Sequence, residues 1–598
     1  MFRSPDKNQS FPEMEERILK LWEGDDSFQL SVKNRPVDKP FVFNDGPPFA
    51  TGLPHYGHLL AGTIKDIVPR YWTMKGYRVE RRFGWDCHGL PIENIIQDKL
   101  ALHTVKDITN FGVDKFNDAC RAGVFTYTKE WRKTVARMGR WVDFDNEYKT
   151  MDLSFMESVW WVFKQCFDKG LIYQGYRIQP YSPALATSLS NFEVNQAYKD
   201  RQDPSVTLAF QLEAPHHVGD LHAPSTKEES DEQMLVWTTT PWTLPANMAI
   251  ALHPDLDYTL VRHEGKKYWI AEARRTAYFP EPKAKKGEAT PPAATEVLKT
   301  CKGRELAGRR YKPLFEYMEY TNDKQYTLLM ADFVSADDGA GAVHIAPSFG
   351  EEDFQLGQRE GLSLFDPLDA DGKFMDVVPE WKGIGAKDAD KSILQHLKAQ
   401  GRVFKHETMV HSYPHCWRTD VPLLYRAQKN WFLSLEKPLT DAHGVTKTLK
   451  DWMIHCNRQI NWVPEHIKGG RFGKWLDGAR DWNLSRNRFW GTCIPIWLAE
   501  DGDMLCVGSV DELCALTGTK VVDLHKHIID PLVIKTKDKK TFAADGKEYR
   551  RTPEVLDCWF ESGSMPYAQR HHPFENADSF DANFPPDFIA EEIGRAHV

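Results

Sequence analysis

Two histidines near the start of the chain are spaced so that both can serve one site. His55 and His58 stand three residues apart, after a loop rich in glycine and proline at residues 46–54. Behind them, apolar residues recur at three- and four-residue intervals over residues 59–71, which predicts a helix. The histidines would therefore lie at a helix N-terminus, where backbone N–H groups and the helix dipole attract phosphate. An imidazole there can donate a hydrogen bond to a phosphate oxygen and stabilise developing charge.

A carboxylate suited to an amino group follows the next predicted strand. Residues 77–83 alternate in a strand-like pattern and lead into a loop that contains Asp86. Loops after the strands of an open parallel sheet are where ligands bind, and a carboxylate can fix an ammonium by a charge-assisted bond. The alternative is that Asp86 caps a helix that starts near Pro91. A nucleophilic pair of Cys87 and His88 is disfavoured, because adjacent side chains seldom face each other.

The residues around the histidines indicate a family. An isolated His-x-x-His pair would more simply be two surface residues at a capped helix. Here His-Tyr-Gly-His at residues 55–58 resembles the His-Ile-Gly-His signature of class I aminoacyl-tRNA synthetases. The flanking residues 44–52 and 59–68 resemble isoleucyl-tRNA synthetases of the eukaryotic cytosolic type. The resemblance spans about residues 10–591 and implies that ATP, accompanied by Mg²⁺, is a substrate.

The resemblance also implies roles for individual residues in amino-acid activation. It implies that His55 and His58 are catalytic and bind ATP phosphates, with Gly57 between them in the ATP site. The remaining residues that it places around the amino acid or its adenylate are Gly46 and Asp86 at the amino group, Pro47, Trp490 and Trp559 at the side chain, and Glu591 at the adenylate. The alternative for Trp490 and Trp559 is that both belong to the core.

A second group of candidate residues lies in the middle of the chain. Thr238, Thr239 and Thr240 offer consecutive hydroxyls before a proline, and His344 and Asp353 flank a segment of small residues. A strand end, a buried histidine and a helix-start aspartate are the structural alternatives. Both stretches resemble the editing domain of isoleucyl, valyl and leucyl synthetases. That resemblance implies that Asp353 holds the ammonium of a misattached amino acid, that threonines line the pocket and that a positioned water hydrolyses the ester.

Editing has a physical rationale, because an apolar pocket cannot strongly reject a substrate one methylene smaller. The elements that would position the two sites follow from the pattern of the chain. Strand–helix alternation over residues 40–180 predicts an α/β domain, and short strand-like runs dominate residues 181–425. We therefore expect a Rossmann-like nucleotide-binding domain with a parallel sheet, split by a large β-rich editing insertion.

The expected boundaries are residues 1–180 and 426–591 for the two halves of the catalytic domain and 181–425 for the insertion. Residues 592–598 depart from the family pattern and match a translated sequencing adapter, so we expect an artefactual tail on a truncated chain. The second class I signature, Lys-Met-Ser-Lys-Ser, is not found in the sequence. We therefore expect this chain alone to be inactive in aminoacylation.

Composition limits the remaining possibilities. The net charge of −9 gives no overall attraction to nucleic acid, so RNA would have to bind local basic patches. No run is apolar enough for a membrane span and the N-terminus lacks a signal-peptide core, which predicts a cytoplasmic protein. Ten cysteines occur singly, which predicts reduced thiols. Residues 411–418 offer too few ligands for zinc, so no metal site is expected.

The sequence thus predicts an isoleucine–tRNA ligase activity with editing of valyl-tRNA(Ile). The expected partners are tRNA(Ile), isoleucine and ATP, with no membrane and with a multi-synthetase assembly left open. Two alternatives remain: a sister valyl or leucyl synthetase, or an activation-dead fragment that retains only editing or RNA binding.

Overall fold

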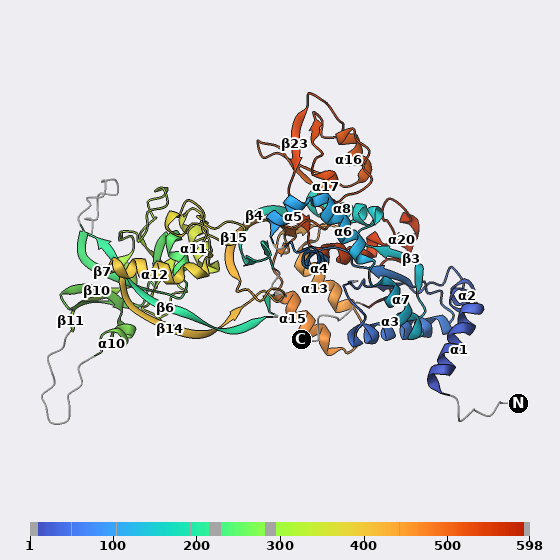
Figure 1. Cartoon of the computed structure of the whole chain (residues 1–598), viewed down its shortest axis with the longest axis horizontal. Helices are drawn as coiled ribbons and strands as arrows, with labels where there is room; N and C mark the ends of the chain where they lie inside the picture. The colour runs from blue at the N-terminus through green and yellow to red at the C-terminus, as the bar shows by residue number, and fades with distance from the viewer. Residues whose placement is uncertain are drawn as a thin grey trace. The chain divides into compact units, whose positions relative to one another are not determined.

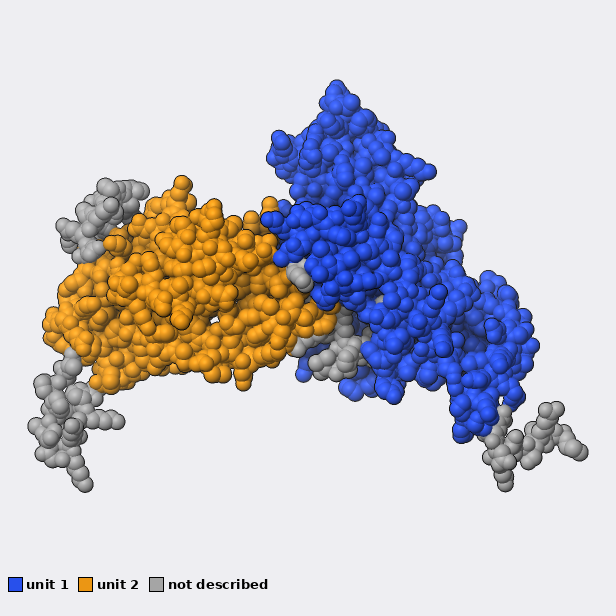
Figure 2. Space-filling model, viewed as in Figure 1, with its two compact units in different colours: residues 1–174, 430–598 blue, residues 175–429 orange. Residues whose placement is uncertain are grey.

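The chain forms two compact units. The computed structural model describes residues 10–49, 51–102, 104–189, 194–195, 197–214, 229–280, 295–441 and 443–590. Unit 1 combines residues 1–174 with 430–598, and unit 2 comprises residues 175–429 (Figure 2). These boundaries lie within a few residues of the expected positions 180/181 and 425/426. The chain passes between the units within β4 (Ile172–Ser182) and β15 (Leu424–Leu433).

The first half of unit 1 alternates strands with helices (Figure 1). Its elements, in chain order, are α1 (Phe11–Gly24), α2 (Ser27–Lys33), β1 (Phe43–Asp45), α3 (Tyr56–Met74), β2 (Arg82–Trp85), α4 (Leu90–Leu100), α5 (Val105–Phe111), α6 (Val113–Val124), α7 (Thr128–Arg137), β3 (Asp143–Lys149) and α8 (Leu153–Asp168). The second half contains shorter elements. Those used below are α13 (Leu449–Gln459), α14 (His466–Gly469), α15 (Arg471–Asp477), β22 (Ile534–Thr536), β24 (Val555–Leu556), α18 (Cys558–Gly563), α20 (Ala577–Asn583) and β25 (Phe588–Ala590).

Four parallel strands of unit 1 form two hydrogen-bonded pairs, β3-β2 and β1-β25, which isolated parallel bridges place side by side. β1 pairs with β25 in parallel, and β2 pairs with β3 in parallel. A parallel bridge between Phe49 and Asp86 joins the residues that follow β1 and β2. The chain therefore leaves β1 toward one side of the sheet and returns on the other side in β25. Ligands of open α/β sheets bind outside the carboxyl ends of the strands at such a reversal.

α3 covers this sheet with one narrow face. Its buried residues Ala61, Lys65, Pro69 and Thr73 recur every four residues, as a helix requires. Next to them lies an apolar cluster that contains Phe41, Phe43 and Val79 from the strand region and Phe588 of β25. The helix continues through Pro69 to Met74.

Unit 2 is built on a nine-stranded mixed sheet. Seven strands have the order β11-β9-β10-β7-β13-β8-β12, and β6 joins β7 to β14. Its elements used below are β6 (Tyr198–Glu213), β7 (Glu229–Thr238), η1 (Pro241–Ala246), β8 (Ala249–Leu252), β9 (Asp257–His263), β10 (Lys266–Ala271), β11 (Thr295–Lys302), β12 (Leu328–Met330), β13 (Ala342–Ile345), α11 (Glu351–Glu360) and β14 (Val403–Pro414). The strands pack around the largest apolar cluster of the described residues, which includes Phe210, Trp242 and Trp269. All ten cysteines are free thiols, and no described helix is both long and apolar enough to cross a bilayer.

Candidate functional site

The two predicted histidines begin α3 and cap it. His55 is the N-cap, and its Nδ1 accepts a hydrogen bond from Gly57 N–H at 3.1 Å. His58 Nδ1 accepts one from His55 N–H at 2.9 Å. Because Nδ1 accepts, each ring can donate only through Nε2. Gly57 N–H, which was expected to serve phosphate, is occupied by His55.

The histidine rings are held by packing as well as by hydrogen bonds. Their centroids are 3.6 Å apart, and His58 also meets the edge of Trp131 at 4.6 Å. Trp131, from α7, donates its Nε1–H to Gly52 O at 2.7 Å. A single side chain thus supports both His58 and the loop that precedes the helix.

A buried ionic group fixes the carboxyl end of β1. Lys65 Nζ lies 2.6 Å from Asp45 Oδ1, and Arg140 pairs with Asp45 Oδ2. Lys65 also donates to Gly46 O at 2.9 Å. Burial of these three charges is tolerable because each is paired. Sequence reasoning missed this group, although a lysine among the inward residues Ala61 and Pro69 of α3 was a usable signal.

Asp86 lies beside the loop that carries Gly46 and Pro47. Its N–H donates to Pro48 O at 2.9 Å, and only 2% of the residue is exposed. It does not cap the following helix, because the N-cap of α4 is Gly89 and no side chain caps that helix end. The structural alternative for Asp86 was therefore wrong, and the residue lies at the carboxyl end of β2 next to the carboxyl end of β1.

Trp490 is attached to the same loop. Its indole Nε1–H donates to Cys87 O at 2.6 Å, and its carbonyl accepts from Gly89 N–H at 3.0 Å. Glu93, fully buried, accepts from the N–H groups of Phe489 at 2.9 Å and of Trp490 at 2.6 Å. Trp490 is itself fully buried. Its position is thus set by the residues that immediately follow Asp86.

A chain of buried titratable groups lies behind Trp490. His88 Nδ1 contacts Glu561, His88 Nε2 lies 2.9 Å from His525 Nε2, and His525 Nδ1 contacts Asp523. Burial lowers the pKa of His525 to about 4, so this ring is neutral. Its Nδ1 lies between Asp523 and Arg121, 3.1 Å from the Arg121 guanidinium, and its Nε2 faces His88. Arg121 balances the charge through Asp523 at 2.6 Å.

This chain supports Trp490 directly. The His525 ring stacks on the Trp490 ring at 4.3 Å with an interplanar angle of 11°. Glu561 also accepts from Thr492 N–H at 2.9 Å. Sequence reasoning missed His525 and Glu561, because both lie more than 400 residues from His88 and neither belongs to a recognisable spacing. Only the folded chain brings them together.

Trp559 is the second residue of α18 and is half-buried. Asp557, the N-cap of α18, accepts from Trp559 N–H at 3.1 Å. The helix begins against the loop after Asp86, since a Cβ on Gly89 would lie 3.0 Å from Cys558 Sγ. Gly89 also has a φ of +85°, so both backbone conformation and contact favour glycine here.

The structure therefore gathers most predicted activation residues at one edge of the parallel strands of unit 1. Backbone contacts connect the loop of Gly46 and Pro47 with Asp86, and connect the residues after Asp86 with Trp490 and the start of α18. Glu591 and residues 592–598 lie outside the described residues. Ala590, the last described residue, accepts from Gly46 N–H at 3.0 Å.

In unit 2, the predicted threonines form a hydroxyl cluster at the end of β7. Thr238 Oγ1 and Thr240 Oγ1 are 3.3 Å apart, and Thr240 Oγ1 is 3.3 Å from Thr243 Oγ1. Thr239 lies between them and is half-buried. Thr243, from η1, was not predicted, although it stands in the same threonine-rich segment.

His344 completes this cluster. β13 pairs with β7 through Val343 and Trp237, which brings His344 near the end of the threonine strand. His344 Nε2 lies 2.8 Å from Thr243 Oγ1. Burial lowers the pKa of His344 to about 4, so the ring is neutral near pH 7. It can exchange a hydrogen bond with a hydroxyl but brings no positive charge to this site.

Asp353 lies in the first turn of α11, as its structural alternative predicted. Its Oδ2 accepts from Ala346 N–H at 2.8 Å. Burial of the carboxyl raises its pKa to about 7, although the residue as a whole is half-buried. Near neutral pH the group is therefore divided between acid and carboxylate, and a bound cation would favour the carboxylate.

Other candidate positions have structural explanations. His411 Nε2 contacts Asp203 at 2.9 Å, and Cys416 is fully buried. Across the residues that the structure describes, no three His, Cys, Asp or Glu side chains are arranged to hold a metal.

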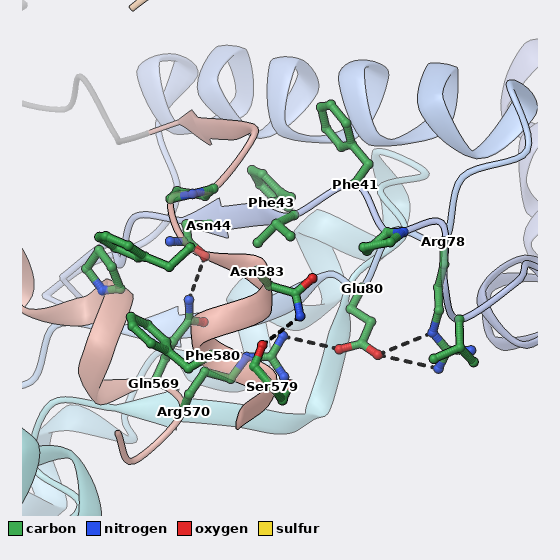
Figure 3. A pocket seen from close by; sticks show the side chains of 16 residues that line it. Phe41, Phe43, Asn44, Arg78, Glu80, Gln569, Arg570, Ser579, Phe580 and Asn583 are labelled. Atoms are coloured by element: carbon green, nitrogen blue, oxygen red, sulfur yellow. Dashed lines mark hydrogen bonds and ion pairs between the residues drawn. The ribbon is translucent and has the colours of Figure 1, made fainter. Parts of the chain in front are cut away.

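A cavity of about 190 Å³ lies at the amino-terminal end of β1, apart from every predicted site residue (Figure 3). Its polar groups are paired with one another. Gln569 Nε2 donates to Asn44 Oδ1 at 2.8 Å, and Arg570 pairs with Glu80 at 3.2 Å.

The comparisons with known proteins agree with this arrangement. Residues 17–596 match the family model tRNA synthetases class I (I, L, M and V). Isoleucine–tRNA ligase of Treponema denticola is 49% identical over 99% of this chain and 53% of its own length. Those of Protochlamydia amoebophila and Chlamydia abortus are each 48% identical over 98% of this chain and 52% of their own length.

These relatives are bacterial, so the eukaryotic cytosolic subtype stays a prediction. The chain spans about half the length of the curated relatives it matches. The family model, by contrast, matches nearly the whole chain, and the chain therefore belongs to the class I tRNA synthetases (I, L, M and V).

Proposed function

We propose that this chain carries the activation and editing sites of an isoleucine–tRNA ligase. The activation site would catalyse formation of isoleucyl-adenylate from isoleucine and ATP, followed by transfer to tRNA(Ile). The observation that carries this proposal is the convergence of the His55–His58 loop, Asp86 and Trp490 at the reversal in strand order. Identity of 49% to a relative named isoleucine–tRNA ligase supports isoleucine over valine or leucine.

The roles of the activation residues follow from their chemistry. In activation, an isoleucine carboxylate oxygen attacks the α-phosphorus of ATP and pyrophosphate leaves. The Nε2–H groups of His55 and His58 would donate to phosphate oxygens, with Gly57 beside them and with Mg²⁺ as part of the ATP substrate. Gly46 and Asp86 would hold the substrate ammonium, and Glu591 would contact the adenylate. The side-chain pocket would be walled by Pro47, Trp490 and Trp559.

Unit 2 would be the editing domain, inserted between the halves of a Rossmann-type catalytic domain at residues 1–180 and 426–591. Asp353 would hold the ammonium of valyl-tRNA(Ile), and Thr238, Thr239, Thr240 and His344 would line the pocket. A positioned water would add to the ester carbonyl and the tRNA ribose oxygen would leave with a proton. The neutral state of His344 supports a hydrogen-bonding role rather than a charged one.

The proposal also covers where the protein acts and what it assembles with. A cytoplasmic location and the eukaryotic cytosolic subtype are both consistent with the sequence, and membership of a multi-synthetase assembly is a further possibility for test.

Calorimetric titration of the chain with isoleucine, valine and leucine tests the activation site. We expect isoleucine to bind most tightly and Asp86→Asn to weaken its binding at least 10-fold, because a charge-assisted hydrogen bond is lost. Equal binding of the three amino acids, or binding unaffected by Asp86→Asn, would contradict the proposed site.

A further inference from the structure

One basic and aromatic segment of unit 1 takes no part in the sites described above. It spans residues 446–480, contains α13, α14 and α15, and is called the basic helical segment below (α13 and α15 in Figure 1). It holds seven lysines and arginines against three carboxylates, in a chain whose net charge is −9. It also holds three tryptophans and a phenylalanine. Because the whole chain is negatively charged, a surface that binds RNA needs such a local excess of basic residues.

Three of the four Trp and Phe rings in the segment form a row that ends at the surface. The Trp462 ring lies 4.8 Å from Phe472, and Phe472 lies 5.6 Å from Trp475. Trp462 Nε1 donates to Asn457 Oδ1 at 2.8 Å, and Asn457 is buried. The inner end of the row is therefore anchored, whereas 60% of Trp475 is exposed. An indole so exposed, yet held from behind by a packed ring, leaves a surface on which another planar group can stack.

Basic residues precede this exposed ring on the same helix. Arg471 and Lys474 precede Trp475 by four residues and by one on α15, and the i and i+4 residues share a helix face. Arg458 and Arg480 are exposed elsewhere in the segment. Among described residues, none of these four cations forms an ion pair. Exposed cations outside the segment commonly do, as in Lys537–Asp545 and Arg550–Glu548.

We propose that the basic helical segment binds single-stranded RNA, with a base stacked on Trp475 and adjacent phosphates against Arg471 and Lys474. Sequence-tolerant binding of single strands combines an aromatic platform with cations that follow the backbone, and this segment supplies both. The cations would release counterions from phosphates, which makes the binding salt-dependent. The inference rests on the proposed function, in which tRNA is the partner. A tRNA has a single-stranded 3′ end, which this surface could bind.

Fluorescence anisotropy with the full chain tests this surface. The probes are labelled tRNA(Ile), a 10-nucleotide single strand and a duplex of the same length. We expect Trp475→Ala to weaken single-strand binding about 10-fold and Trp475→Phe to restore most of it, because stacking needs only an aromatic face. Arg471→Glu with Lys474→Glu should weaken binding further. The slope of log K against log salt should fall by about 1.4 in magnitude, for two lost phosphate contacts.

The matched control is Lys535→Glu with Lys537→Glu, an equal charge change at and beside β22, where both lysines are ion-paired. This variant should bind RNA within twofold of the unaltered chain. Thermal unfolding of each variant checks that the fold is retained. The inference is overturned if Trp475→Ala and Trp475→Phe behave alike, if the control loses as much affinity, or if polyglutamate displaces the RNA, since an acidic protein would then fit the surface equally well.

Isoleucine titration on the same variants separates this inference from the proposed function. If substitutions in the basic helical segment leave tRNA affinity unchanged, the inference is overturned and the proposed function remains intact. Single-strand binding that depends on Trp475, in a chain that does not bind isoleucine, would support the inference and reject the proposed activation site.

Discussion

At the scale of single residues, histidines that can exchange hydrogen bonds occur in both candidate sites. In His55 and His58, Nδ1 accepts a backbone hydrogen bond, so each ring can donate only through Nε2. His344 is neutral near pH 7 because burial lowers its pKa to about 4. A neutral imidazole supplies hydrogen bonds without a fixed charge. The carboxylates proposed to face a substrate ammonium are Asp86 in unit 1 and Asp353 in unit 2.

The pKa of Asp353 gives a pH-dependence that can be measured. Only the carboxylate pairs with an ammonium, and the raised pKa of about 7 means that it forms as pH rises through 7. We expect kcat/KM for valyl-tRNA(Ile) deacylation, divided by that of Asp353→Asn, to rise from near 1 at pH 5.5 as the carboxylate forms. The ratio should fall again above about pH 8, where the α-ammonium of the substrate loses its proton. A ratio that stays constant with pH would contradict the assignment.

Two substitutions can separate the capping role of His55 from its proposed role in phosphate binding. Asparagine is a good N-cap, whereas alanine is a poor one, and neither replaces the Nε2–H donor. We expect His55→Asn to unfold at the same temperature as the unaltered chain, but His55→Ala to lose about 1 kcal/mol of stability. Both should weaken ATP binding about 10-fold in calorimetric titration, because a donor to a charged phosphate is lost. Unchanged ATP affinity in His55→Asn would exclude a phosphate role.

At the scale of elements, strand pairing decides which residues meet. Asp45 and Trp85 end β1 and β2, and the parallel register places the residues that follow them side by side. In unit 2, pairing of β13 with β7 brings His344 to the threonines. These pairings depend on close backbone approach, which glycines before β13 permit. Gly341 has a φ of +74°, and a Cβ there would lie 2.3 Å from the Ala271 Cβ.

A pair of glycine substitutions separates backbone strain from overlap. Gly265, between β9 and β10, has a φ of +78° and open space around it. We expect Gly265→Ala to cost about 1 kcal/mol through backbone strain alone. Gly341→Ala should cost about 3 kcal/mol, because overlap with Ala271 adds to the strain. Scanning calorimetry of the full chain measures both. If both variants lose the same stability, the strands around Gly341 accommodate the added Cβ at no further cost.

At the scale of the whole molecule, the two candidate sites belong to separate compact units. Each site is assembled from residues of its own unit. The activation residues come from residues 1–174 and 430–590, and the editing residues from residues 175–429. Each unit also has its own apolar clusters. The two activities should therefore be separable by single substitutions.

The separation can be tested with one substitution in each unit. Asp86→Asn should weaken isoleucine binding at least 10-fold and leave deacylation of valyl-tRNA(Ile) within twofold. At pH 8, where the carboxylate is ionised, Asp353→Asn should weaken deacylation of valyl-tRNA(Ile) and leave isoleucine binding within twofold. Calorimetric titration and a deacylation assay on the same preparations measure both effects. A loss of deacylation in Asp86→Asn would mean that the units do not act independently.

The sequence by itself determined the local features. The start of α3 and the β-rich middle of the chain follow from periodicity, glycine and proline positions and composition. A strand before Asp86 was also predicted, but it spans residues 82–85 rather than 77–83. The motifs that identify the family are also local, because loops that bind ligands need particular residue types at fixed spacing. The alternative that Asp86 caps the following helix was wrong. The spacing of a carboxylate from a helix does not show whether its side chain faces the end of that helix.

Tertiary structure alone decided the contacts between distant segments. Lys65 and Arg140 at Asp45, His525 and Glu561 behind Trp490, and Thr243 at His344 come from different elements. A sequence pattern predicts the type of an element, but it does not specify which residues of another element will contact it. Which buried charge meets which partner depends on how helices and strands pack, and the pKa values of His344 and Asp353 depend on that same packing.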